Sequence, residues 1–462
     1  MKILPYFIAI GLLLTSCSAV QPNLYQLYRV DDIQFQQPDD NYRQNPVVII
    51  PGIISSELVN EQGKNVWFGP WYKTLFDDFE ELELAIDPVT LTAKPSVIKA
   101  STLPKAVLGF DFYGSLFNLL EKYGDYKLTE LGTPFENNER RYYMFPFDWR
   151  YDNTDTIKQL DAVIEQIRKD YNDPTLKVDV IAHSMGGLLA RYYMRYGTAD
   201  VLDDNDFPIT QAGAKKVRRL IQLGTPNLGS VAAMHQLMNG YSVVLGTVPV
   251  ESIVTMPSLY HLLPHPLNDW LITNEGKTLK RDLYDINIWR RFEWGIFDPK
   301  VIARIKKHSA TEQAGEERFM LLQAYFEKYL ERARRFVWSL TIPVPDIEYS
   351  IIAFGGNCKP TPARLLVEEV NGESKIRLWP HQVKNKIDGL DYKRLMLEPG
   401  DGRVTKPSLL ARDSLNPAIP RHEYSFFPLD YAFFLCHDHG QLTGNINFQD
   451  NLLNALLERD ET

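Results

Sequence analysis

The sequence Val-Asp-Val-Ile-Ala-His-Ser-Met-Gly-Gly, which runs from Val178 to Gly187, decides the fold of this chain. Its first half predicts a short buried strand, and a helical pattern begins directly after the serine. A serine between a strand and a helix lies on a strained turn that exposes its hydroxyl at the edge of a parallel sheet. Such a turn needs small residues near the serine. Gly186 and Ala182 are small, although a glycine is more usual at the position of Ala182. The stretch therefore predicts Ser184 as a nucleophile.

Predicted strands and helices alternate along the chain on both sides of this turn. The apolar run 47–50 is closed by Pro51-Gly52, which is typical of a buried parallel strand followed by a turn. We expect further strands and helices, in chain order, at 113–123 (helix), 141–147 (strand), 157–167 (helix), 177–181 (strand), 187–196 (helix), 217–223 (strand), 349–354 (strand) and 451–457 (helix). This succession predicts an α/β fold whose mainly parallel sheet is covered by helices on both faces.

The alternation stops after residue 229, and this divides the chain into segments. Residues 230–345 are aromatic and look largely helical, so we interpret them as a cap or lid insertion. The core would then have two parts, residues 46–229 and residues 346–462. Within the second part, residues 363–395 contain Asn-Gly between two apolar-containing runs, which predicts an inserted β-hairpin.

The N-terminus has the features of a targeting segment. The apolar run from Ile3 to Leu14 is too short to span a bilayer and suits a signal peptide. It ends in Leu-Thr-Ser-Cys, which resembles the bacterial lipoprotein cleavage box. We therefore expect residues 1–16 to be a signal peptide, Cys17 to be lipidated and residues 17–45 to form a polar tether. Ser18 favours the outer membrane, facing the periplasm; a plain secretory signal with an incidental cysteine is the alternative.

Composition argues against several classes of protein. The net charge is −9 and no basic run occurs, so nucleic acid is not an expected partner. No His-Glu-x-x-His motif or cysteine pair with ligand spacing occurs, and we expect neither a metal nor an organic cofactor. The three cysteines, at 17, 358 and 436, cannot form a disulfide framework. Whether Cys358 and Cys436 pair is left open, because the sequence does not fix their distance.

A nucleophilic serine needs a base and a group that orients the base. On a sheet of this kind, the three follow in the order serine, acid, histidine. Gly-Asp-Gly around Asp401 predicts a tight loop that projects a carboxylate, although a plain surface turn has the same composition. His437 and His439, near the C-terminus, are the candidates for the base. His183 is too close to Ser184 along a sharp turn to reach its hydroxyl, so we expect it to pack or to face the substrate.

The oxyanion of an acyl-transfer reaction needs two backbone donors. One is expected from Met185, directly after the serine, and the other from Ile53, in the loop after the first apolar strand. Because the donors are backbone N–H groups, their side chains are free to be apolar.

Several segments together resemble the lecithin:cholesterol acyltransferase family of α/β-hydrolases. They are Val47–Ile53, Phe147–Arg150, Ala182–Gly187, Leu223–Ser230, Pro360–Pro362, Gly400–Val404 and His439–Leu442. The resemblance implies an α/β-hydrolase fold in which Ser184 is the nucleophile, Asp401 the acid and His439 the base. It favours His439 over His437 because Leu442 stands at the family's spacing from His439 alone. It also implies acyl esters of glycerolipids as substrates, transfer to an alcohol or to water, and no cofactor.

The lid loop departs from the family pattern. Members of the family close this loop with a disulfide, whereas residues 55–75 contain no cysteine. Trp67, Phe68 and Trp71 either recruit acyl chains at the membrane interface or pack under the cap, and the sequence leaves both alternatives open. Trp149 is a further candidate for substrate contact.

Three hypotheses for function follow. The first is a lipid-anchored acyl hydrolase or O-acyltransferase that acts on phospholipid-like glycerolipids through an acyl-enzyme on Ser184. The second is an esterase for soluble acyl esters, and the third is a catalytically inactive fold that serves as a binding module. The sequence does not decide between them, nor does it give the acyl acceptor, the head group or the oligomeric state.

Overall fold

The computed structural model describes residues 43–69, 79–107, 110–243, 246–344, 347, 349–412, 415, 418 and 420–458. The expected signal peptide, Cys17, most of the tether and Trp71 lie outside these residues.

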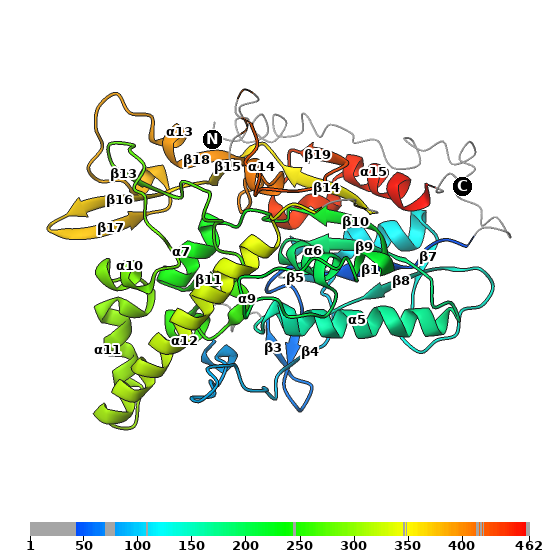
Figure 1. Ribbon diagram of the computed structural model, residues 1–462, viewed down its shortest axis with the longest axis horizontal. Coiled ribbons are helices and arrows are strands. Elements are labelled where there is room, and N and C mark those ends of the chain that lie inside the picture. The colour runs from blue at the N-terminus through cyan, green and yellow to red at the C-terminus, as the bar shows by residue number, and fades with distance from the viewer. Residues whose placement is uncertain are drawn as a thin grey trace, which may run out of the picture.

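A seven-stranded sheet with the order β19-β14-β10-β9-β1-β8-β7 forms the centre of the molecule (Figure 1). Every neighbouring pair in it is parallel, which confirms the predicted sheet. Its strands, in chain order, are β1 (Val47–Ile50), β7 (Tyr126–Leu128), β8 (Arg140–Met144), β9 (Val178–His183), β10 (Val217–Leu223), β14 (Ser350–Gly356) and β19 (Tyr431–Leu435). The strand predicted at 141–147 ends early because Pro146 has no N–H with which to continue the ladder.

Helices cover both faces of this sheet (Figure 1). Successive side chains of a strand point to opposite faces. In β1, Val48 and Ile50 accordingly pack with α5 (Asn153–Asp170) and α6 (Met185–Tyr196). Val47 and Ile49 pack with α4 (Gly114–Asn118) and α15 (Ile446–Leu457) on the other face. Helix α15 begins before the predicted residue 451 because the Asn445 side chain accepts hydrogen bonds from the N–H groups of Asn447 and Phe448.

The segment 230–345 is mainly helical, and it lies at the left of the sheet in Figure 1. Its helices are α7 (Val231–Asn239), α8 (Val250–Ile253), α9 (Pro257–Tyr260), α10 (Ile286–Arg291), α11 (Pro299–Lys307) and the long α12 (Glu312–Ser339). It also holds three strands that the sequence did not predict: β11 (Tyr241–Val243), β12 (Gly246–Val248) and β13 (Leu271–Thr273). Strands of three residues are too short to show an alternating pattern.

The hairpin predicted in residues 363–395 is confirmed. Strands β16 (Leu365–Val370) and β17 (Glu373–Arg377) pair antiparallel. The turn residues Asn371 and Gly372 have φ of 55° and 79°, as a type I′ turn requires. Strand β13 from the cap segment pairs in parallel with β16, so one small sheet joins the two insertions.

Short elements complete the described chain. They are β2 (Leu58–Val59), β3 (Asn65–Trp67), η1 (Glu80–Leu82), β4 (Lys99–Ala100), β5 (Ala106–Val107), β6 (Phe110–Asp111), η2 (Leu119–Tyr123), η3 (Ala214–Lys216), η4 (Gly295–Phe297), β15 (Lys359–Pro362), η5 (Pro380–Gln382), α13 (Tyr392–Met396), β18 (Leu397–Gly400), α14 (Lys406–Leu409) and η6 (His439–Gly444). Strands β15 and β18 pair antiparallel and lead into the loop that carries Asp401.

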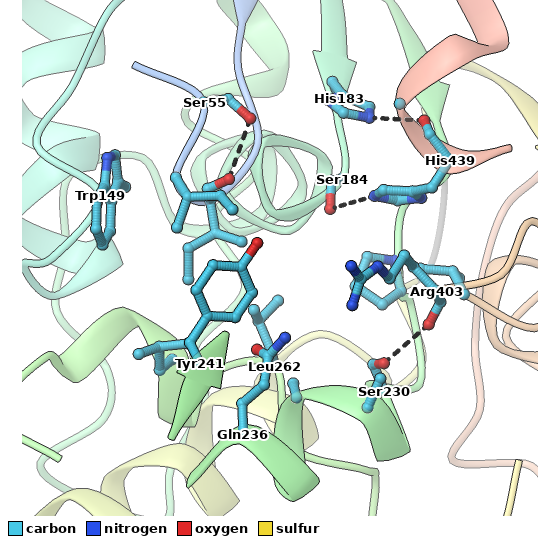
Figure 2. A pocket seen from close by; sticks show the side chains of 18 of the residues that line it. Ser55, Trp149, His183, Ser184, Ser230, Gln236, Tyr241, Leu262, Arg403 and His439 are labelled. Atoms are coloured by element: carbon cyan, nitrogen blue, oxygen red, sulfur yellow. Dashed lines mark hydrogen bonds between the residues drawn. The ribbon is translucent and has the colours of Figure 1, made fainter. Parts of the chain in front are cut away.

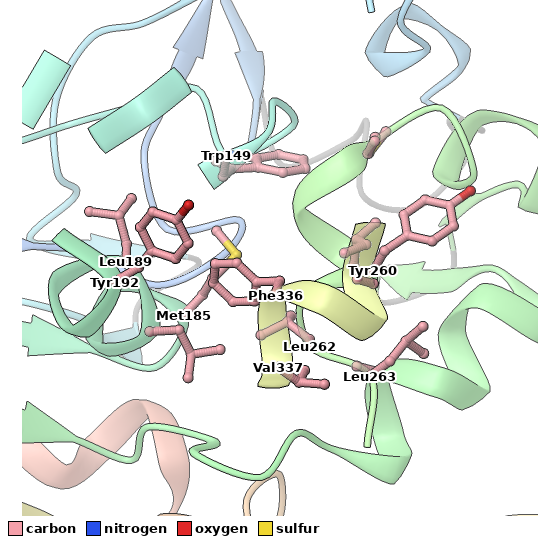
Figure 3. Packing of buried hydrophobic residues seen from close by; sticks show 14 of the residues in the cluster. Trp149, Met185, Leu189, Tyr192, Tyr260, Leu262, Leu263, Phe336 and Val337 are labelled. Carbon is pink, nitrogen blue, oxygen red and sulfur yellow. The ribbon is translucent and has the colours of Figure 1, made fainter. Parts of the chain in front are cut away.

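The helical segment shares a continuous hydrophobic core with the sheet. Figure 3 shows Leu189 and Tyr192 of α6 near Phe336 and Val337 of α12. The rings of Tyr192 and Phe336 are stacked with their centroids 5.5 Å apart. The cap is therefore held against the helix that follows Ser184, and the position of its inner face depends on α12.

Candidate active site

Ser184 lies on a strained turn between β9 and α6. Its φ is +53°, in the left-handed region that residues other than glycine rarely adopt. A Cβ on Gly186 would lie 2.5 Å from the carbonyl oxygen of Pro51, and one on Gly52 would lie 2.9 Å from the Cβ of Ser184. The absence of side chains at these two glycines lets α6 and the loop after β1 approach the serine closely.

The structure brings Ser184, His439 and Asp401 together from three distant parts of the chain. Nε2 of His439 lies 3.0 Å from Oγ of Ser184, and Nδ1 of His439 lies 2.8 Å from Oδ2 of Asp401 (Figure 2). With the carboxylate on Nδ1, the neutral imidazole carries its proton there, so Nε2 accepts a hydrogen bond from the serine hydroxyl. This is the geometry that a serine nucleophile needs from its base.

Asp401 is held as a carboxylate by its own loop. Burial alone would raise its pKa, but His439 and the backbone donors outweigh burial, and the pKa lies below the ordinary value of 3.8. The N–H groups of Arg403 and Val404 donate to Oδ1 at 2.9 and 2.7 Å. The N–H of His439 donates to the carbonyl oxygen of Asp401 at 2.9 Å, which ties the two loops together. The other candidate histidine, His437, is not among the residues that line the cavity beside Ser184.

His183 belongs to a buried hydrogen-bond chain that the sequence did not reveal. The N–H of Gly52 donates to the Tyr113 hydroxyl (3.2 Å), and that hydroxyl lies 3.0 Å from Nδ1 of His183. Nε2 of His183 lies 3.3 Å from the carbonyl oxygen of His439. Burial, and then the charge of His439, lower the pKa of His183 to about 3, so the ring is neutral near pH 7. A neutral ring satisfies all of these contacts when it accepts from Tyr113 and donates to His439. Tyr113 is 70 residues away in sequence, and no local pattern predicts this contact.

A cavity of about 280 Å³ opens beside Ser184. Its lining is largely apolar and comes from both the core and the helical segment (Figure 2): Ile53, Ile54, Ser55, Trp67, Phe112, Trp149, His183, Ser184, Pro226, Ser230, Ala232, Ala233, Gln236, Tyr241, Val248, Ile253, Met256, Leu259, Leu262, Arg403, Val404, His439 and Gly440. An apolar cleft with a few convergent polar groups is the usual form of a small-molecule site.

The aromatic residues of the lid loop are placed inside the molecule as far as they are described. Trp67 is fully buried, donates its indole N–H to the carbonyl oxygen of Ile54 (2.7 Å) and packs on Trp149 with centroids 5.4 Å apart. Its burial fits the alternative in which this residue packs under the cap. Phe68 is partly buried and stacks on Trp67. Trp67 and Trp149 line the cavity, so both stay candidates for substrate contact.

The two expected oxyanion donors come from neighbouring strands. Ile53 follows β1 and lines the cavity, and Met185 is the first residue of α6 after β9. Strands β1 and β9 pair with Ile50 opposite Ala182, so both loops leave the sheet at the same edge. The role of these two N–H groups stays a prediction.

A disulfide joins Cys358 and Cys436, whose Cα atoms are 5.0 Å apart. It links the loops that follow the neighbouring strands β14 and β19, three residues before His439. The pairing that the sequence left open is thus made in the structure, and it constrains the loop that carries the histidine.

The described residues contain neither a group of side chains suited to a metal ion nor a helix suited to a bilayer. No three His, Cys, Asp or Glu side chains there are grouped so that they could hold a metal ion. No helix in that part of the chain combines the length and the apolar character needed to cross a bilayer.

Comparison with known proteins gives matches to part of the sequence and to the fold. The family model of lecithin:cholesterol acyltransferase matches residues 128–294. Lecithin-cholesterol acyltransferase-like 4 of Arabidopsis thaliana is 25% identical over 266 residues, 51% of this chain and 46% of that protein. The chain therefore spans about half the length of this curated relative. Ser184 and Trp149 lie in the matched family segment, whereas Asp401 and His439 lie outside it.

The fold itself is also found in a solved structure. A chain in the crystal structure of the Tle4–Tli4 complex superimposes with a TM-score of 0.57 at 15% identity, covering 89% of this chain and 98% of that one. At this identity the similarity shows the fold alone. The chain thus has an α/β-hydrolase fold and is similar to lecithin:cholesterol acyltransferases over residues 128–294.

Proposed function

We propose that the protein is a serine-dependent enzyme that cleaves acyl esters of glycerolipids and transfers the acyl group to an alcohol or to water. The observation that carries the proposal is the hydrogen-bonded series Ser184–His439–Asp401 at the wall of an apolar cavity. The family match over residues 128–294 supports this class of chemistry independently of the acid and the histidine.

The chemistry follows from the positions of the three side chains. His439 takes the proton from the Ser184 hydroxyl as Oγ attacks the ester carbonyl carbon. The resulting oxyanion is stabilised by the N–H groups of Ile53 and Met185. His439 then gives its proton to the leaving alcohol oxygen, the C–O bond breaks, and the acyl group stays on Ser184. Water or a second alcohol repeats these steps in reverse order, which releases the acyl group and restores the serine.

The apolar lining of the cavity supports the proposal that the substrates are lipids. Its walls are mostly aliphatic and aromatic side chains, and the helices α7, α8 and α9 contribute Ala232, Ala233, Ile253 and Leu259. An acyl chain that leaves water for such a surface gains roughly 0.8 kcal/mol for each methylene that it buries. Long-chain esters therefore gain more from this site than short soluble esters do.

Attachment to the outer membrane through lipidated Cys17 is part of the same proposal. The Cys358–Cys436 disulfide supports an oxidising compartment such as the periplasm. An enzyme held at the surface meets its two-dimensional substrate at a high effective concentration. Cys17→Ser should move the protein from the membrane fraction to the soluble periplasmic fraction, and continued attachment would remove this part of the proposal.

One assay tests the proposed activity. Purified protein and its Ser184→Ala variant are incubated with bilayers of acyl-labelled phospholipid, with and without diacylglycerol as an acceptor, and the products are separated. We expect released fatty acid or an acylated acceptor with the wild type and neither with the variant. Faster turnover of a short soluble ester than of any bilayer substrate would favour the esterase hypothesis. Equal product from both proteins would exclude Ser184 as the nucleophile.

A further inference from the structure

The cavity beside Ser184 is bordered by a single arginine. Arg403 is the one Lys or Arg among the described residues that line it, and no Asp or Glu is among them. Within the described part of the chain, Arg403 makes its hydrogen bonds through its backbone. Its N–H donates to Asp401, and its carbonyl oxygen accepts from the Ser230 hydroxyl. The guanidinium is left available for a ligand.

The side chain of Arg403 is directed into the cavity. Figure 2 shows its guanidinium directed toward the interior of the cavity, and the Tyr241 hydroxyl points inward from another wall. Burial raises the pKa of Tyr241 and the charge of Arg403 lowers it, as expected for two groups that share one space. Arg403 is exposed, so its cation lies at the open side of the cavity, and the Tyr241 hydroxyl faces the same largely apolar space.

His439 must reach the leaving alcohol oxygen in order to protonate it. Arg403 follows Asp401 by two residues, and Asp401 holds His439, so the loop that carries the arginine also positions the base. The alcohol half of a bound ester, which must meet His439, is therefore the half assigned to Arg403.

We propose that Arg403, with Tyr241 as a second donor, binds the phosphate of a glycerophospholipid whose acyl group is transferred to Ser184. This inference rests on the proposed function and adds the residues that select the head group. A guanidinium matches the oxygens of a phosphate with paired N–H donors, and such charge-assisted hydrogen bonds are the stronger ones. In a glycerophospholipid the phosphate is attached to the leaving glycerol, the half of the ester beside His439.

The test compares two substrates that differ in the phosphate head group. Phosphatidylcholine and diacylglycerol with identical acyl chains are presented in the same neutral detergent micelles, and kcat/KM is measured for each. We expect Arg403→Gln to lower the phosphatidylcholine-to-diacylglycerol ratio of kcat/KM roughly tenfold to hundredfold, the usual size of a lost charge-assisted hydrogen bond. Tyr241→Phe should lower the ratio less. Arg412→Gln is the matched control, because it removes the same charge from an exposed residue that does not line this cavity.

The outcomes of this test separate the phosphate site from the proposed function. An unchanged ratio in Arg403→Gln, or an equal fall in Arg412→Gln, overturns the phosphate site. A wild type that cleaves diacylglycerol but not phosphatidylcholine overturns it too, while the proposed function stands. A wild type that cleaves neither substrate overturns the proposed function itself.

Binding without turnover gives a second readout. Trp67 and Trp149 line the cavity, so their fluorescence reports its occupancy in the Ser184→Ala protein. A non-hydrolysable diether phosphatidylcholine should bind more tightly than the matching diether glycerol, and Arg403→Gln should remove the difference. Tighter binding of oleate than of the diether phosphatidylcholine would assign Arg403 to a fatty-acid carboxylate and contradict the proposal.

Discussion

At the scale of single residues, the reactive groups are held by partners on other loops. Asp401 keeps a lowered pKa through His439 and two backbone N–H donors, although it is almost fully buried. The order serine, acid, histidine and the Gly-Asp-Gly loop pointed to Ser184, Asp401 and a histidine at 437 or 439, and the family resemblance favoured His439. The hydrogen bonds of His183 and Tyr113 were not predictable, because they depend on a contact 70 residues apart.

Asp401→Asn should lower kcat by about 10⁴ if the carboxylate fixes the tautomer of His439. The amide has nearly the same shape, so the fold should persist while Nε2 loses its role as a base. The measurement is kcat on a long-chain ester, with the melting temperature as a check on folding. Near-normal turnover would mean that another carboxylate orients the imidazole.

Tyr113→Phe should lower kcat about tenfold, with little change in KM. The lost hydroxyl leaves the Gly52 N–H and Nδ1 of His183 without a hydrogen bond in a buried place, and each loss costs roughly 1–3 kcal/mol. The loops that carry Ile53 and His439 are then less well aligned. Tyr431→Phe is the control because Tyr431 is exposed. If Tyr113→Phe has the same kcat as this control, the hydrogen-bond chain through Tyr113 and His183 does not align the catalytic loops.

At the scale of elements, long or strongly patterned segments were predicted and short ones were not. The strand–turn–helix around Ser184 and the Asn-Gly hairpin carry their own local signals. Strands β11, β12 and β13 span three residues each, and β13 pairs with β16 from a different part of the sequence. Such pairing depends on the tertiary arrangement of the cap, which local pattern does not encode.

Helix α12 is fixed to the core by a cluster of charges around the buried Asp152. Arg332 donates to Asp152 (2.6 Å) and to Asp200 (2.5 Å), and Asp152 also caps α5. Burial would raise the pKa of Asp152, but the nearby His261 and Arg332 outweigh it and lower the pKa below 3.8. Folding thus favours the carboxylate, and the resulting stability is present above the ordinary pKa and is lost as the pH falls below it.

Arg332→Ala should lower the free energy of unfolding by about 3–5 kcal/mol at pH 7, because it leaves the buried carboxylate of Asp152 without its cation. The deficit relative to wild type should shrink as the pH falls toward 3. Arg334→Ala, which removes a pair with Asp282 that is more exposed, is the matched control. Urea unfolding at pH 7 and at pH 3.5 measures both variants. A deficit that does not depend on pH would mean that lost packing, and not charge, causes the effect.

At the scale of the whole molecule, the two insertions and the sheet edge are tied to each other. The cap segment shares its core with α6 and its strand β13 with the hairpin insertion. The Cys358–Cys436 disulfide closes a loop of 78 residues that contains this insertion and Asp401. The site is therefore assembled from regions whose relative position depends on the complete fold.

Cys358→Ser with Cys436→Ser should lower the free energy of unfolding by about 4 kcal/mol, as loop-closure entropy predicts for a loop of this length. Activity should fall more steeply with temperature, because the bond lies three residues from His439. Differential scanning calorimetry compares the melting temperature of the double variant with those of the oxidised and the reduced wild type. Equal melting temperatures would show that the bond does not stabilise the protein.

Covalent labelling of the serine tests the central claim most directly. The wild type, Ser184→Ala and His439→Ala are treated with a long-chain fluorophosphonate and analysed by intact mass and peptide mapping. We expect one adduct on Ser184 in the wild type, none in Ser184→Ala and labelling at least a hundredfold slower in His439→Ala, because the imidazole removes the hydroxyl proton. An adduct on another residue, or full-rate labelling without the His439 ring, would contradict the central claim.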